Sequence, residues 1–196
     1  MQLFFDNPES EPQEVIKNSE TVKIWFNRLA GTTLRDVDKA NGTINMEGVE
    51  NLLQSLKLEP TDLIVGYMYY LMDAKSSTEL TEKEFERLMN HCQAKDPQQF
   101  INNLPNLRKE FSNRDTFKRV YEHVYALQRE QAKSLSFDTA VILWELYLKG
   151  HFALYDEFMQ YLQQIPKNKQ KSVNPDTWKM VIEFDDVTKG DLSKYK

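Results

Sequence analysis

The sequence is poor in residue types that several protein classes require. It has one cysteine, Cys92, among 196 residues, so no internal disulfide can form. This usage is compatible with the reducing cytosol or nucleus, and a lone cysteine is most often a buried thiol. Six glycines and seven prolines are few for a turn-rich all-β protein, which argues against that class.

Long apolar runs and an excess of basic residues are also missing. No run approaches the roughly 20 apolar residues that span a bilayer, and the N-terminus lacks the basic-then-apolar order of a secretion signal. The net charge of −5 and the pI near 5.3 argue against non-specific nucleic-acid binding, which needs clustered Lys and Arg. We therefore expect a soluble intracellular protein, cytoplasmic and/or nuclear, with no nucleic-acid or membrane partner.

The sequence is rich in apolar residues that recur at helical spacing. Hydrophobic residues make up 40% of the chain and aromatic residues 12%, more than a disordered chain carries. The most apolar stretch, residues 135–158, predicts a helical hairpin in which Ser136 caps the first helix and Gly150 follows it. Pro105 is expected to interrupt or restart another helix. The predicted fold class is all-α.

Two acidic loops resemble damaged EF-hand calcium sites. In residues 36–47 the glycine does not fall at the turn position, and in residues 73–84 Lys75 stands at a ligand position and the turn glycine is missing. Ile44 and Leu80 can still meet in a short two-stranded contact without metal. We therefore expect an EF-hand-like first half without metal, packed on a helical second half, and no cofactor.

The helix predicted over residues 63–72 is apolar almost all the way round, so it is either deeply buried or lines a groove. Met46, Met68 and Met72 are adaptable side chains of the kind that line grooves for amphipathic helices, although ordinary core is the commoner role. An alternative function is therefore an EF-hand-like calcium-sensing adaptor with a Met-rich groove.

No catalytic constellation is present in the sequence. The three histidines, His91, His123 and His151, lie on different predicted elements, and none is at metal-ligand spacing from another. A phosphate-binding glycine loop and a nucleophile elbow are missing too. We interpret the histidines as ordinary surface or core residues and the chain as a binding module rather than an enzyme.

Several segments together resemble a known family. The segments PTDLIVGYMYYLMDAKSSTELTEKEF, FKRVYEHVYAL, LSFDTAVILWELYLKGHFALYDEFMQYL, PDTWKMVIEF and DLSKY are similar to the potentiating-neddylation domain of the defective-in-cullin-neddylation family. The most specific pieces are Trp144 with Gly150 and Phe152, and the PDTW element at residues 175–178. The resemblance covers residues 22–195, nearly the whole chain.

The resemblance implies an all-helical domain and a scaffold function. Members of the family hold a cullin together with the conjugating enzyme charged with a ubiquitin-like modifier, and so promote transfer of the modifier to a cullin lysine. They supply no catalytic group, so this chain is expected to be a non-catalytic activator of a ubiquitin-like ligase. The implied partners are a cullin, a neddylation conjugating enzyme with an acetylated N-terminus, and the RING subunit of the ligase.

The resemblance also carries binding residues over to this chain. Asp176 matches the first acidic residue of the family's cullin-binding patch, whereas an alanine and a second acidic residue of that patch have no counterpart before Lys196, so weakened cullin binding is expected. Ser77 stands where the family can have a longer polar side chain. The pocket for the acetylated methionine would be lined by Met46, Val49, Val65, Met68, Tyr69, Met72, Leu80, Leu127, Leu143 and Leu146. The family commonly has aromatic residues at three of these positions, Met72, Leu80 and Leu127.

The two ends differ from the middle of the chain. Residues 1–18 are polar and punctuated by proline after a short apolar start, and FFDNPE resembles the last helix of the ubiquitin-binding domain that precedes this domain in some family members. We therefore expect residues 1–18 to be the remnant of a preceding helix and a linker. Residues 19–196 are expected to form the potentiating-neddylation domain without its C-terminal end.

Overall fold

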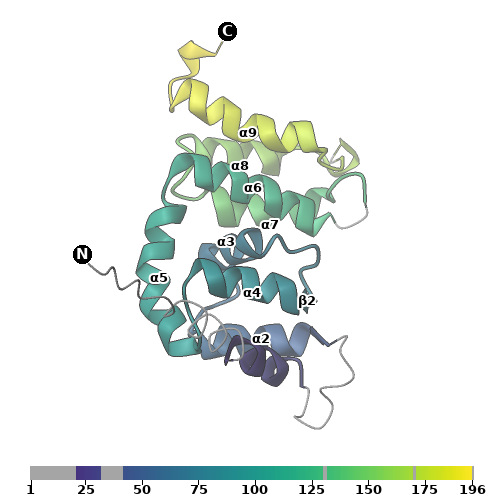
Figure 1. The fold of residues 1–196 in the computed structure, drawn as a ribbon. Helices are drawn as coiled ribbons and strands as arrows, with labels where there is room; N and C mark the ends of the chain where they lie inside the picture. Colours follow the sequence, from purple (N-terminus) through teal and green to yellow (C-terminus); the bar gives the residue numbers. More distant parts are fainter. Residues whose placement is uncertain (1–20, 32–41, 130–131, 170, 196) are drawn as a thin grey trace, which may run out of the picture. The chain divides into compact units, whose positions relative to one another are not determined.

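The fold is known from a computed structural model, which describes residues 21–31, 42–129, 132–169 and 171–195. In this part of the chain the structure is mainly α-helical, as predicted, with one pair of short strands (Figure 1). None of the described helices is long and apolar enough to cross a membrane. The predicted remnant at residues 1–18 lies outside the described residues.

In the described residues both strands lie in the first half of the chain, and only helices follow the second strand. The elements are a helical segment at residues 21–29, β1 (Thr43–Ile44), α2 (Met46–Ser55), α3 (Leu63–Met72), β2 (Leu80–Thr81), α4 (Glu82–His91), α5 (Pro97–Phe111), α6 (Arg114–Gln128), α7 (Phe137–Leu148), α8 (Tyr155–Gln164), the 3-10 helix η1 (Lys167–Lys169), α9 (Pro175–Thr188) and the 3-10 helix η2 (Leu192–Lys194).

The chain forms two compact units that do not follow the order of the sequence. Among the described residues, the first contains those up to Glu59 together with Thr78–Leu107, and the second contains Pro60–Ser77 together with those from Arg108 onward. Helix α3, which the sequence placed in the EF-hand-like half, therefore belongs to the second unit. The EF-hand-like character of the first half stays a prediction.

Short strands join the two acidic loops in the first unit. β1 and β2 pair antiparallel with Ile44 opposite Leu80, which confirms the contact predicted from the sequence. Directly after β2, the hydroxyl of Thr81 accepts the N–H of Glu84 at 3.3 Å, and the carboxylate of Glu84 accepts the N–H of Thr81 at 2.7 Å. This reciprocal capping box fixes the start of α4.

The core of the first unit is built around the fully buried ring of Phe85. Trp25 meets this ring edge-on, with the two ring centroids 5.1 Å apart. Gly48 on α2 allows a close approach, because a Cβ atom there would lie 2.4 Å from the carbonyl oxygen of Leu29 and 2.6 Å from the side chain of Ile44. A larger residue at position 48 would therefore push α2 away from the segment at residues 21–29.

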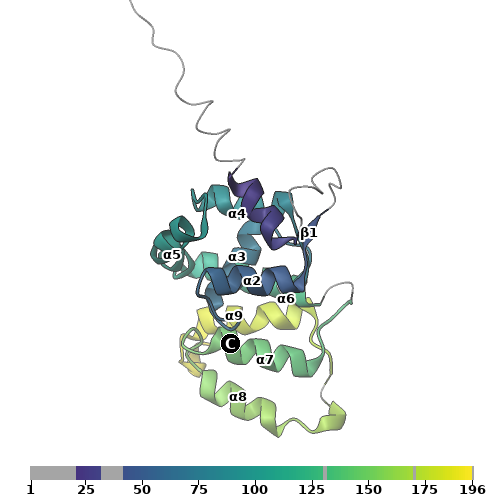
Figure 2. The ribbon, with the colours of Figure 1, turned by 90° about the horizontal axis from the view of Figure 1, so that it is seen from below.

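Helix α6 is central to the second unit, because α3 and α9 both pack on it. Figure 1 shows α9 running along α6, and Figure 2 shows α7 and α8 side by side as the predicted hairpin. The hydroxyl of Ser136 accepts the N–H of Thr139 at 3.1 Å and caps α7, as predicted. Gly150 has φ of +77°, the left-handed conformation expected after the helix.

The prediction that Pro105 interrupts or restarts a helix is wrong. Helix α5 runs from Pro97 to Phe111 with Pro105 inside it. A proline has no backbone N–H, so the helix gives up one hydrogen bond at this point. Phe100 and Leu107, one on each side of the proline in sequence, are fully buried, and their packing outweighs that loss.

Candidate functional site

The ten predicted pocket residues are distributed over both units. Met46, Val49 and Leu80 belong to the first unit. The second unit holds the other seven, which are Val65, Met68, Tyr69 and Met72 on α3, Leu127 on α6, and Leu143 and Leu146 on α7. Met46 is exposed, Tyr69 and Leu146 are partly exposed, and the others are buried. A pocket that combines all ten stays a prediction.

Helix α3 is held tightly in the second unit. The carboxylate of Asp62 accepts the N–H of Ile64 at 3.0 Å, which caps the helix, and it also accepts Nη1 of Arg108 at 3.0 Å. The guanidinium of Arg108 holds the pKa of Asp62 below its usual range. Gly66 brings α3 close to α7, because a Cβ atom there would lie 1.9 Å from the hydroxyl oxygen of Tyr147.

The hydroxyl of Tyr69 ties the last turn of α3 to the loop that follows. It donates to the backbone carbonyl of Ser77 at 3.0 Å. Burial raises the pKa of Tyr69 to about 12, so the phenol stays neutral and keeps its proton for this bond. The contact uses the backbone of Ser77, so it does not need the longer polar side chain that the family can have at this position.

Asp176, the predicted cullin-binding residue, is exposed in the first turn of α9. The side chain of Asn174 accepts the N–H of Thr177 at 2.8 Å, and Pro175 is the first helical residue, which confirms the predicted helix start. A carboxylate here also stabilises the helix dipole, so its position alone assigns no function. The neighbouring residues form a shallow groove of about 200 Å³, lined by Glu122, Tyr125, Ala126, Arg129, Pro175, Trp178 and Lys179.

A buried aromatic cluster fixes the PDTW element on α6. The indole N–H of Trp178 donates to the carbonyl of Tyr121 at 3.0 Å, and the hydroxyl of Tyr121 donates to the carbonyl of Trp178 at 3.1 Å. The two rings stack with centroids 4.2 Å apart. Trp144 of α7 donates its indole N–H to the hydroxyl of Tyr121 at 2.8 Å. Two of the residues most specific for the family resemblance, Trp144 and Trp178, thus meet on one tyrosine and hold the start of α9.

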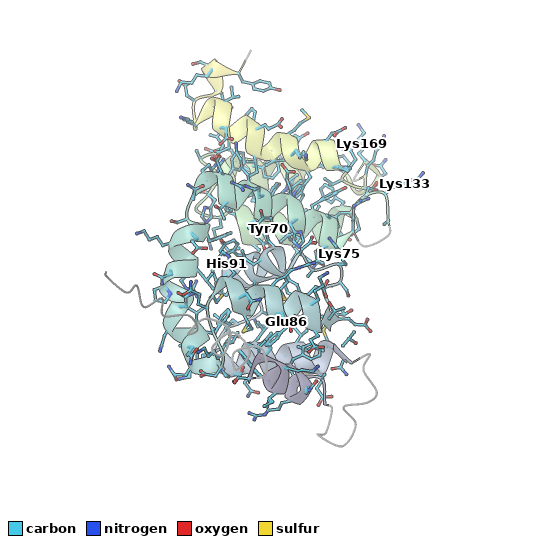
Figure 3. All side chains as sticks on the ribbon, in the orientation of Figure 1. Tyr70, Lys75, Glu86, His91, Lys133 and Lys169 are labelled. Atoms are coloured by element: carbon cyan, nitrogen blue, oxygen red, sulfur yellow. The ribbon has the colours of Figure 1, made fainter. Side chains whose placement is uncertain are left out.

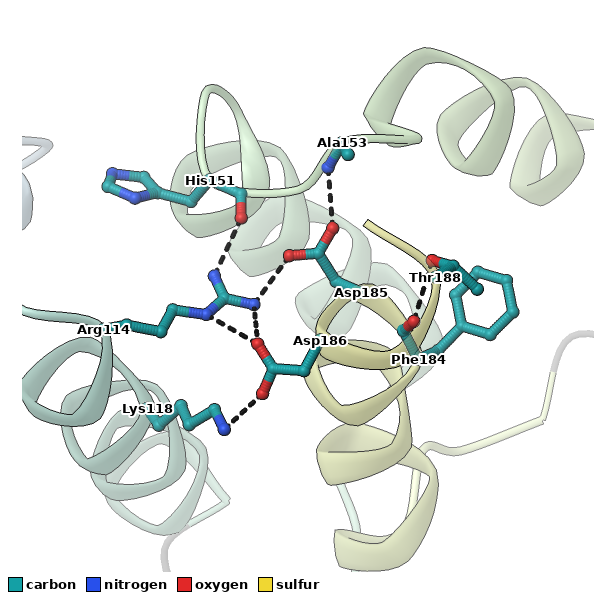
Figure 4. A network of polar contacts seen from close by, with 8 residues as sticks. All are labelled: Arg114, Lys118, His151, Ala153, Phe184, Asp185, Asp186 and Thr188. Carbon is teal, nitrogen blue, oxygen red and sulfur yellow. Dashed lines mark hydrogen bonds and ion pairs between the residues drawn. The ribbon is translucent and has the colours of Figure 1, made fainter. Parts of the chain in front are cut away.

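A charged network holds the C-terminal half of α9 (Figure 4). Arg114 at the start of α6 donates through Nη2 to Asp185 at 2.6 Å, through Nε to Asp186 at 2.9 Å, and through Nη1 to the carbonyl of His151 at 2.9 Å. Asp185 also accepts the backbone N–H of Ala153 at 2.8 Å. No sequence motif indicated this network, because its members are far apart along the chain.

An apolar groove lies along α9, and it was not predicted. Its volume is about 530 Å³, and it is lined by Phe152, Phe158, Thr177, Met180, Val181, Glu183, Phe184, Val187 and Tyr195. Met180, Val187 and Tyr195 are 56%, 54% and 56% exposed. The available sequence signal was the recurrence of Met180, Glu183 and Val187 at helical spacing on one face of α9.

Metal ligands do not gather in the described parts of the chain, where no group of three or more His, Cys, Asp or Glu side chains is placed to hold an ion. In the second acidic loop the ammonium of Lys75 pairs with Asp73 at 2.5 Å, at the position where a calcium site would have its first carboxylate ligand. Residues 36–41 of the first acidic loop lie outside the described ranges.

Known proteins resemble this chain over most of its length. A family described as cullin binding has a model that matches residues 99–196, half of the chain and the part that contains Asp176 and the aromatic cluster. The chain is 27% identical over 179 residues to DCN1-like protein 5 of Bos taurus, covering 91% of this chain and 71% of that protein. It is 27% identical over 192 residues to DCN1-like protein 4 of Homo sapiens, covering 97% of this chain and 62% of that protein. The Drosophila melanogaster DCN1-like protein 4 is 25% identical over 154 residues, 78% of this chain and 61% of its own length.

Proposed function

The chain belongs to the cullin-binding family, and on this premise we propose that it promotes cullin neddylation as a non-catalytic scaffold. The scaffold holds a cullin and the modifier-charged conjugating enzyme at the same time, and the RING subunit of the ligase is a further proposed partner. The family match over residues 99–196 is the observation that carries this proposal. The gain is positional, because joint binding replaces a chance encounter with an effective local concentration of about a millimolar or more.

The cullin is proposed to bind at Asp176. Its carboxylate is exposed, and the helix that carries it is fixed by the cap at Asn174 and by the buried ring of Trp178. An exposed carboxylate on a rigid helix end suits a basic side chain or a backbone N–H of the partner.

Charge reversal at Asp176 tests this contact. Asp176→Arg should weaken binding of a cullin C-terminal domain at least about tenfold, because an attractive contact becomes a repulsive one. Asp138→Arg is the matched control, since Asp138 is also an exposed carboxylate in the first turn of a helix of the second unit. Equal cullin affinity for both variants would remove Asp176 from the interface.

The conjugating enzyme is proposed to insert its acetylated N-terminal methionine into an apolar pocket. The residues that support this within the second unit are Met68 and Met72 on α3 and Leu143 and Leu146 on α7, of which Leu146 is partly exposed. Acetylation removes the N-terminal charge, so the methionine enters apolar surroundings without desolvating an ammonium group.

A charge at Leu146 tests this pocket. Leu146→Asp should abolish binding of an acetyl-methionyl peptide of the conjugating enzyme while the protein stays folded. Ile142→Asp is the matched control, because Ile142 lies one turn earlier on α7 and is 63% exposed. Unchanged peptide affinity in Leu146→Asp, or an equal loss in both variants, would contradict the pocket assignment.

A further inference from the structure

His123 on α6 has a buried nitrogen, Nε2, that makes no hydrogen bond within the described residues. Its ring meets the ring of Tyr70 edge-on, with centroids 5.7 Å apart, and Tyr70 is labelled in Figure 3. Leu127, a predicted pocket residue, lies one turn later on the same face of α6. His123 is therefore next to the residues of α3 and α6 that are proposed to take up the methionine.

The neutral imidazole of His123 offers an acceptor at this atom in one of its two tautomers. Nε2 has no hydrogen-bond partner within the described residues, and the backbone of Tyr69 acts on the ring. With the proton on Nδ1, Nε2 carries a lone pair that is cut off from water. Burial lowers the pKa of His123, so the ring is neutral at pH 7. Buried acceptors nearly always find a donor, so this atom needs a partner in another state of the protein.

We propose that Nε2 of His123 accepts the amide N–H of the acetylated methionine when this residue occupies the pocket. The inference rests on the proposed function above. An acetylated N-terminus presents one amide N–H in an otherwise apolar end group, and that N–H must find an acceptor when it leaves water. Leu127 and Met72 have no nitrogen or oxygen in their side chains, so they cannot accept this N–H.

This contact makes peptide binding depend on pH. Protonation puts a hydrogen on Nε2 and removes the acceptor, so affinity should be constant above neutral pH and should fall as the pH falls through the pKa of His123, which burial lowers from its ordinary value. The charged groups that act on the ring are Asp73 and Lys75 in the loop after α3. They have opposite effects on the pKa of the ring and pair with each other at 2.5 Å, and the titratable side chain of Tyr70 on α3 meets the imidazole edge-on.

A double-mutant cycle tests the contact. An acetyl-methionyl peptide with an amidated C-terminus and no His, Asp or Glu is titrated by calorimetry into the wild type and into His123→Phe, and the same peptide N-methylated at the methionine is titrated into both. N-methylation should weaken binding to the wild type about tenfold, the value of one hydrogen bond, and binding to His123→Phe less than about twofold. His91→Phe is the matched control, because His91 is exposed on α4 of the first unit, and it should behave as the wild type.

The outcomes separate this inference from the proposed function. A wild type that does not bind the acetylated peptide contradicts the pocket and this contact together. If the wild type binds, but N-methylation costs the same affinity in the wild type and His123→Phe, the contact is overturned and the pocket stands. His123→Gln, which keeps an acceptor without a titratable ring, should retain the discrimination against N-methylation and lose the fall in affinity at low pH. A persistent pH profile in that variant would overturn the contact.

Discussion

Asp185→Asn should destabilise the second unit by about 2–3 kcal/mol. Asp185 is 8% exposed and accepts Nη2 of Arg114 at 2.6 Å and the N–H of Ala153 at 2.8 Å. An asparagine has nearly the same shape, but it has no charge to match Arg114 and turns an NH₂ donor toward one of the two donors. Each hydrogen bond that involves a charged group contributes about 1.5–3 kcal/mol, and the lower end applies because Arg114 keeps Asp186 and the carbonyl of His151 as partners.

Urea unfolding followed by tryptophan fluorescence measures this loss, because Trp144 and Trp178 both lie in the second unit and stack with centroids 5.5 Å apart. Asp186→Asn is the matched control. Asp186 also pairs with Arg114, but its side chain is 31% exposed whereas that of Asp185 is 11% exposed, so its loss should cost about 1 kcal/mol or less. A change below about 0.5 kcal/mol for Asp185→Asn, the range of ordinary surface substitutions, would refute the reasoning. An equal change in the free energy of unfolding for Asp185→Asn and Asp186→Asn would refute it as well.

Three further predictions concern the elements that carry the proposed sites. Gly66→Ala should cost about 1–2 kcal/mol of stability, because its Cβ atom would lie 1.9 Å from the hydroxyl oxygen of Tyr147, and adding Tyr147→Phe should recover part of that loss in a double-mutant cycle. Asn174→Ala should cost about 1 kcal/mol in urea unfolding through loss of the α9 cap. Arg108→Met should be less stable than the wild type near neutral pH. Because Arg108 lowers the pKa of Asp62 in the folded state, this difference should shrink as the pH falls below about 4, the pKa of an unfolded aspartate, and a pH series of urea unfolding curves with no such convergence would argue against it.

The features that could be predicted from the sequence are those with short-range causes. The capping box of Thr81 and Glu84 and the cap of Asn174 follow from residues within one helical turn. The pairing of Ile44 with Leu80 is longer in range, but two similar loops indicated it. For the two helix caps, one local pattern is enough to decide the structure.

The features that could not be predicted depend on packing between distant segments. Pro105 has a local preference to end a helix, and the burial of Phe100 and Leu107 overrides it. Arg114 and Asp185 are far apart in the sequence, and neither lies in a recognisable motif. The surroundings of His123 could not be predicted either, because Tyr69 and Tyr70 lie on α3 whereas His123 lies on α6.

The candidate site was predicted through family resemblance and not through residue chemistry. The resemblance singled out Asp176, and the structure shows why its position is well defined: Trp178 and Tyr121 bond reciprocally beside it. It also singled out apolar residues such as Met68, which are hard to distinguish from ordinary core by pattern alone, since both are buried at helical spacing. Only binding measurements separate these two roles.

The central claim, that the chain acts by holding two partners together, is tested most directly by the rate of modifier transfer at increasing concentrations of this chain. Purified cullin with its RING subunit and a modifier-charged conjugating enzyme with an acetylated N-terminus are held constant in a single-turnover assay. A scaffold predicts a rate that rises, passes through a maximum and then falls, because excess scaffold binds each partner in separate complexes. Asp176→Arg should abolish the rise. A rate that climbs to a plateau without declining, or no acceleration at any concentration, would contradict the account.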